Sequence, residues 1–167
     1  IRSTNSSGYG AAINFQANDG TDDDVIVARL YSEPNNANDS DFRIATRDGG
    51  TLANRITILQ EKVGIGTTSP DQILHVHKGS AGTIASNSDS VLTLENSGTA
   101  ILQFLTPNSN SNQIRFGDPQ DNGSGYIDYS HSTNALTFGT AGPEKMRIDS
   151  SGNLGINTSS PSTIVSN

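Results

Sequence analysis

The sequence predicts an all-β protein built from iterated modules, and three observations lead to this prediction. Apolar residues alternate with polar ones with a period of two along most of the chain, which is typical of short β-strands. Gly, Asn, Asp and Ser, which turns favour, gather between the alternating stretches. A nine-residue motif occurs twice, at residues 62–70 and 153–161, and such self-similarity indicates a repeat architecture.

The expected strands are short, and each is marked by apolar residues that share one face. In chain order these are Ile13/Phe15, Ile26/Ala28/Leu30, Phe42/Ile44, Ile56/Ile58, Val63/Ile65, Leu74/Val76, Leu92/Leu94, Leu102/Phe104, Ile114/Phe116, Leu136/Phe138, Met146/Ile148 and Leu154/Ile156. Turn residues separate them at 18–20, 48–50, 96–98, 121–123 and 151–153. No segment has the spacing of an amphipathic helix.

The two motif copies divide the chain into a first β module, 1–78, and a second, 79–167, joined by a Gly/Ser-rich stretch. Upstream of each copy we expect a strand, a Gly-containing turn and a second strand. The Arg55-Ile56 and Arg147-Ile148 pairs lie 92 residues apart, whereas the motif copies lie 91 apart. One residue was therefore gained or lost between them.

The composition favours a chain that shares its core with neighbouring subunits. Apolar residues make up only 32% of the chain and aromatic residues 5%, although aromatic side chains usually dominate core energetics. The net charge of −7 disfavours nucleic acid and anionic membranes as partners. No apolar run approaches the ~20 residues that cross a bilayer, and without Cys the chain has no disulfides.

The substitutions between the motif copies predict its backbone. Gly66 becomes Asn157, the residue type that most often replaces glycine at positive φ, so a left-handed conformation is expected there. Gly64 stays glycine as Gly155, which predicts a position where a Cβ does not fit. A tight turn in a monomeric β-sandwich would explain the same pattern and stays an alternative.

The motif resembles the recurring Ser-Ser-Gly-Asn-Val-Gly-Ile-Gly-Thr-Thr-Ser-Pro repeat of bacteriophage tail fibres and tailspikes. Residues 150–161 and 63–70 follow this pattern, and residues 73–76, 114–118, 125–129 and 146–149 look like the same family. The resemblance implies an elongated fibre in which short strands interwind or stack in a parallel homotrimer. Many such fibres end in an autoproteolytic chaperone domain, but no lysine here lies in its cleavage context.

The function expected from this resemblance is a rigid trimeric shaft of a virion tail fibre, outside the cell, that positions a host-binding tip. Its partners would be copies of itself, other tail or fibre proteins and host surface glycan. We expect no enzymatic activity and no cofactor. The residues expected at the contacts between subunits are Val63, Gly64, Ile65, Leu154, Gly155 and Ile156. A non-phage adhesin or extracellular filament with the same repeat is an alternative.

Two sets of residues suggest metal ligands. His75 and His77 lie on one strand face, and three copies around an axis would offer six imidazoles to a transition metal. The acidic residues at 19 and 22–24 offer oxygen ligands for Ca²⁺, but their spacing fits no EF-hand loop. Exposed or packed histidines and a solvated turn are the interpretations that we favour.

Glycan-directed activities are the remaining alternatives. Tyr126 and Tyr129 are candidates for stacking on sugars and should project from opposite strand faces. A depolymerase tailspike would need two carboxylates in a cleft, for which Asp118, Asp121 and Asp128 are candidates. Residues 64–69 partly match a dinucleotide-binding loop but lack its third glycine and the helix that should follow.

Overall fold

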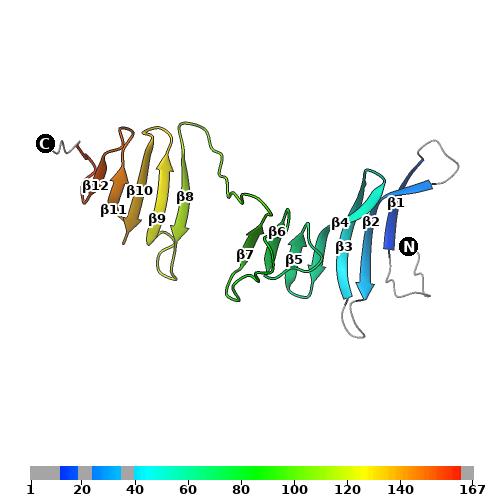
Figure 1. The fold of residues 1–167 in the computed structure, drawn as a ribbon. Coiled ribbons are helices and arrows are strands. Elements are labelled where there is room, and N and C mark those ends of the chain that lie inside the picture. The colour runs from blue at the N-terminus through cyan, green and yellow to red at the C-terminus, as the bar shows by residue number, and fades with distance from the viewer. Residues whose placement is uncertain (1–11, 19–23, 35–39, 163–167) are drawn as a thin grey trace. The chain divides into compact units, whose positions relative to one another are not determined.

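The computed structural model describes residues 12–18, 24–34 and 40–162, and all regular structure there is β (Figure 1). Twelve strands form two sheets, and these residues include no helix that could cross a membrane. The all-β prediction is confirmed. The chain divides into two compact units, Ile1–Leu102 and Gln103–Asn167, and each unit holds one sheet.

The first sheet contains seven strands that lie side by side in sequence order. β1 to β5 pair antiparallel, whereas β5, β6 and β7 run parallel to one another. The strands are β1 (Ala12–Asn18), β2 (Asp24–Pro34), β3 (Ser40–Asp48), β4 (Thr51–Leu59), β5 (Lys62–Ile65), β6 (Leu74–His77) and β7 (Leu92–Glu95). Because β7 joins this sheet, the first unit extends past the module boundary expected after residue 78.

The second sheet is an antiparallel meander of five strands, again in sequence order (Figure 1). They are β8 (Ser111–Phe116), β9 (Gly125–Ser130), β10 (Ala135–Thr140), β11 (Glu144–Ile148) and β12 (Leu154–Ile156). Short connections suit this topology, since antiparallel neighbours need only a tight turn.

Two hairpins in different sheets use the same turn. Gly49 and Gly50, between β3 and β4, have φ values of 54° and 84°. Ala141 and Gly142, between β10 and β11, have φ values of 53° and 94°. Two consecutive residues of positive φ match the right-handed twist of the flanking strands. A β-bulge interrupts both hairpins, between Ile44 and Ala45 in one and next to Gly139 in the other.

The alternation predicted nearly every strand. All the expected apolar pairs lie in strands except Leu102/Phe104, where the chain has no strand pairing. The apolar alternation gave no pair for β9, which was expected only as the strand that carries Tyr126 and Tyr129. This strand carries Tyr126 on one face and Ile127 and Tyr129 on the other, so it has no clean apolar alternation.

Each sheet is a single layer in the described part of the chain. Strands contact only near neighbours within their own sheet, and no strand of a second layer covers either face. Ala45 and Ala135 are the buried apolar residues among the described positions. Domains usually bury the apolar side of a sheet against another layer, so both sheets lack their usual cover.

Candidate functional site

One face of the first sheet carries two continuous rows of apolar side chains, since directly paired residues project to the same side. We call it the first apolar face. The longer row crosses all seven strands through Ile13, Leu30, Ile44, Ile56, Ile65, Val76 and Leu94. The shorter row crosses β3 to β7 through Phe42, Ile58, Val63, Leu74 and Leu92.

The second sheet repeats this arrangement, and we call its apolar side the second apolar face. One row crosses all five strands through Ile114, Ile127, Phe138, Met146 and Ile156. A neighbouring row crosses them through Asn112, Tyr129, Leu136, Ile148 and Leu154. A slip of one residue in any strand would break both rows, so the register is well specified.

The four apolar residues expected at subunit contacts all lie in these rows. Val63 is half-buried, whereas Ile65, Leu154 and Ile156 are 42%, 56% and 70% exposed. The two glycines of the same set are buried and point to the opposite, polar side of their sheets. In each sheet the apolar candidate contact residues therefore lie on the apolar face, and the candidate glycine is buried on the opposite side.

The glycines are required by the motif itself. A Cβ on Gly64 would lie 2.7 Å from the carbonyl oxygen of Thr67, and a Cβ on Gly155 would lie 2.7 Å from that of Thr158. In each copy the chain turns back over its own glycine. The Cβ atom of Pro70 would lie 3.5 Å from a Cβ on Gly64, and that of Pro161 would lie 3.2 Å from a Cβ on Gly155. The predicted exclusion of a Cβ is confirmed, and the excluding atoms belong to the same chain.

The prediction of positive φ is also confirmed. Gly66 has φ 79° and Asn157 has φ 54°. Their amides donate to the carbonyls of Arg55 and Lys145, at 2.9 and 2.8 Å. In each copy a serine amide donates to the threonine hydroxyl two residues earlier, from Ser69 to Thr67 at 3.1 Å and from Ser160 to Thr158 at 3.2 Å. The two copies thus share their local geometry as well as their sequence.

The alignment of the preceding strands differs from the one expected. Ile58 lies opposite Val63, and Ile148 lies opposite Leu154, so these two isoleucines correspond and Arg55-Ile56 does not match Arg147-Ile148. The reason is the turn, which has four residues between Ile58 and Val63 and five between Ile148 and Leu154. The extra residue lies in the turn, where Asp149 accepts the amides of residues 151 and 153.

On the polar side of the first sheet, His75 anchors a buried hydrogen-bond cluster. Its side chain is 3% exposed, and its Nε2 lies 3.0 Å from Glu95 Oε2. The backbone N–H of Asp71 donates to His75 Nδ1 at 3.3 Å, which places the ring proton on Nε2. The backbone N–H of Ala81, which donates to Glu95, lowers the pKa of that carboxyl, and the His75 hydrogen bond adds to this.

The two histidines of the expected metal site do lie together, with ring centroids 5.8 Å apart. However, both nitrogens of His75 have partners within the chain, and both rings lie on the polar side. A shared site on an axis would need this polar side to face inward. Within residues 12–18, 24–34 and 40–162, no group of three or more acidic or histidine side chains is arranged to hold a metal ion.

The two candidate tyrosines lie on opposite faces of β9, as predicted. Tyr126 is half-buried on the polar side, where its ring covers Gly139 so closely that a Cβ there would overlap the ring. Tyr129 is 37% exposed on the second apolar face, with its ring edge-on to His131 at 5.0 Å. Only Tyr126 shares a side with charged residues, among them its direct cross-strand partner Arg115.

The acidic residues near β9 have structural partners. Asp118 accepts the amides of Gln120 and Asp121 and the hydroxyl of Ser124, and the hydrogen bonds from those two amides lower its pKa. Asp128 accepts a hydrogen bond from Gln113 across the β8–β9 pair. These carboxylates close a turn and link two strands.

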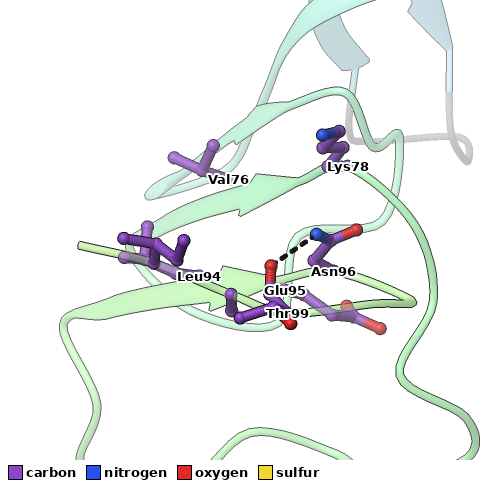
Figure 2. Close-up of a pocket in the computed structure, with 8 residues that line it drawn as sticks. Val76, Lys78, Leu94, Glu95, Asn96 and Thr99 are labelled. Atoms are coloured by element: carbon purple, nitrogen blue, oxygen red, sulfur yellow. Dashed lines mark hydrogen bonds between the residues drawn. The ribbon is translucent and has the colours of Figure 1, made fainter. Parts of the chain in front are cut away.

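Two cavities lie beside the apolar faces. One, of about 280 Å³, lies at the end of the first apolar face, where Val76, Leu94 and Ile101 form its apolar lining (Figure 2). Lys78 and Glu95 add charge at its rim, and Asn96 donates to the carbonyl of Thr99 at 2.8 Å. A cavity of about 710 Å³ lies beside β12 and includes Leu154 and Ile156.

Some expected residues lie outside the described part of the chain, namely Asp19, Asp22 and Asp23, while only the backbone of Asp24 is described. The sequence analysis missed the role of Glu95, which His75 contacts from 20 residues away. It also missed Arg147, which pairs with Glu144 through two hydrogen bonds of 2.8 and 2.9 Å. No spacing signalled that pair, because residues i and i+3 of a regular strand project to opposite faces, and the β-bulge next to Gly139 changes that alternation between Glu144 and Met146.

The candidate site is therefore a pair of uncovered apolar faces, each bordered by one copy of the turn motif. No protein-family model matches this chain, and no curated protein does.

Proposed function

We propose that this chain is a non-enzymatic structural module of a trimeric fibre, either a phage tail fibre or a similar extracellular appendage. Three copies would meet through their apolar faces and form a rigid shaft that positions a host-binding tip. The observation that carries this proposal is that both sheets are single layers whose apolar rows no other strand covers among residues 12–18, 24–34 and 40–162.

The distribution of polarity supports an assembly with a definite inside. The rows are apolar from strand to strand except at Asn112 on the edge strand β8. The opposite side carries Arg43 with Asp41 and Arg147 with Glu144. Covering the apolar side would bury hydrocarbon and leave these ion pairs on the other side of each sheet, outside the contact. Each apolar side chain of Ile, Leu or Phe size would then contribute up to about 1.5–3 kcal/mol.

The number of copies and their parallel arrangement rest on the resemblance to tail-fibre repeats. Three identical sheets around an axis can each present one apolar face inward, and a closed arrangement of this kind leaves no apolar face uncovered. Host attachment, other fibre proteins as partners and a location on the virion follow from the same resemblance. They are parts of the proposal and share its test.

Native mass measured by light scattering or analytical ultracentrifugation tests the assembly. One chain has a mass of 17.5 kDa, so three copies should give about 52 kDa. A single chain that melts cooperatively at 17.5 kDa would contradict the proposal. A stable dimer would keep the covered apolar faces but contradict the trimer.

A glycan-binding role is a second candidate, favoured by the position of Tyr126. In an assembly with the apolar faces inward, Tyr126 stays on the outer side next to Arg115, whereas Tyr129 is covered. Binding of the intact assembly to a glycan array, lost in Tyr126→Ala and retained in Tyr129→Phe, would support this role. Equal binding by the Tyr126→Ala variant would contradict it.

A further inference from the structure

The segment of residues 100–105 has the sequence of a strand but no strand partner in the described chain. It reads Ala-Ile-Leu-Gln-Phe-Leu, in which Ile101 and Phe104 are of types enriched in strands. It contains Leu102/Phe104, the one expected apolar pair that lies in no strand of the described chain. We call it the unpaired segment.

Its backbone also lacks partners in the described part of the chain. Among the described residues, no peptide group from 100 to 105 takes part in a backbone–backbone hydrogen bond. The side chain of Asn112 donates to the carbonyl of Phe104 at the long distance of 3.5 Å. Backbone N–H and C=O groups that stay unpaired are costly once water is excluded from them.

The side chains of the segment are exposed to an unusual degree. Ile101 and Leu105 are 74% and 82% exposed, and Leu102 and Phe104 are 57% and 46% exposed. At one end, Ile101 lines the cavity with Val76 and Leu94, which are residues of the first apolar face (Figure 2). At the other end, Asn112 belongs to a row of the second apolar face. In the sequence, the segment therefore lies between the last strand of the first sheet and the first strand of the second.

We propose that the unpaired segment forms a β-strand with the same segment of a second copy of this chain. This inference rests on the proposed homomeric assembly and adds where the chains exchange backbone hydrogen bonds. In a parallel assembly, identical segments lie at the same height, so that each can pair with its neighbour. A second copy is the occupant that fits, because it supplies a matching strand and covers the apolar side chains together.

Amide hydrogen exchange on the intact assembly tests the pairing. The amides of residues 101–105 should exchange as slowly as those of β10, because interchain hydrogen bonds protect them. The amides of Asn108 and Ser109, which are exposed and make no backbone hydrogen bond among the described residues, provide an internal reference for fast exchange. Fast exchange of residues 101–105 in an assembly of trimer mass would overturn this inference and leave the proposed function standing. A monomeric chain would overturn both.

Proline substitutions provide a second, independent test. Leu102→Pro and Gln103→Pro remove amides that point to opposite edges of an extended segment, and proline has no N–H to donate. At least one of the two variants should lose the assembled form, whereas the Gln103→Ala control should retain it. Circular dichroism checks that both sheets still form, since the segment lies outside them. Full assembly of both proline variants would overturn the pairing.

Discussion

The Ile156→Asp variant tests whether the second apolar face is covered by other copies of the chain or exposed to solvent. Ile156 ends the row that crosses all five strands of the second sheet, and its side chain is 70% exposed in the single chain. If the chain functioned alone, an aspartate at so exposed a position would change the free energy of unfolding by no more than about 0.5 kcal/mol. The variant would then resemble the wild type.

In the assembly, the same substitution acts at a covered position. Burying the remaining exposed surface of Ile156 contributes about 1–2 kcal/mol per chain, or about 3–6 kcal/mol for three copies. The aspartate would lose this contribution and bring an unpaired charge from every copy into an apolar contact, at a cost of several kcal/mol more. We therefore expect the variant to sediment as a single chain.

The assay is sedimentation velocity together with thermal melting, and Ser159→Asp is the matched control. Ser159 is an exposed residue of the same motif copy, so its substitution adds the same charge away from the apolar rows. The control should keep the mass and the melting temperature of the wild type. An Ile156→Asp variant with an unchanged mass and melting temperature would refute the argument that the apolar faces are covered.

Three further results are expected. Gly66→Asn should destabilise the fold, because a Cβ there would overlap the His77 carbonyl. Asn157→Gly should change the free energy of unfolding by less than about 1 kcal/mol. Urea denaturation measures both variants, and equal losses of stability would contradict this expected difference. Thr57→Val should raise the free energy of unfolding by about 1 kcal/mol, because the Thr57 hydroxyl is buried without a hydrogen-bond partner, and a lowered urea midpoint would contradict this. Hydrogen bonds from the side chain and backbone of Asn153 lower the pKa of Asp149. The ionised carboxylate therefore stabilises the fold above the unfolded pKa of about 3.9. This contribution is lost as the pH falls through the lower pKa of the folded state. The Asp149→Asn variant should therefore lose less stability than the wild type between about pH 5 and pH 2, and parallel losses would contradict this assignment.

Much of the fold could be predicted from the sequence, because in a single-layer sheet the alternation of apolar residues reports directly on the exposed face. Ile56 and Ile58, for example, were expected on one side of a strand and lie in the two rows of the first apolar face. The replacement of Gly66 by Asn157 likewise predicted a backbone angle that both residues have. Local signals were sufficient in these cases, since each depends on only a few consecutive residues.

Features that depend on distant pairing were not predictable in the same way. The contact between His75 and Glu95 arises because β6 and β7 pair in parallel, and no spacing in the sequence announces that register. The expected strand at Leu102 and Phe104 has no partner within the described chain. Local alternation can suggest a strand, but it does not show whether a second strand lies beside it. The mismatch of Arg55-Ile56 with Arg147-Ile148 came from a turn of different length, which side-chain type does not reveal.

The open apolar rows also bear on how the protein reaches its working form. If the chain buries this surface only against other copies of itself, its melting temperature should rise with protein concentration, because dissociation accompanies unfolding. During refolding from dilute solution, encounters between copies would compete with off-pathway aggregation of the bare sheets. Synthesis of several chains on one messenger RNA would raise their local concentration and so favour assembly over aggregation.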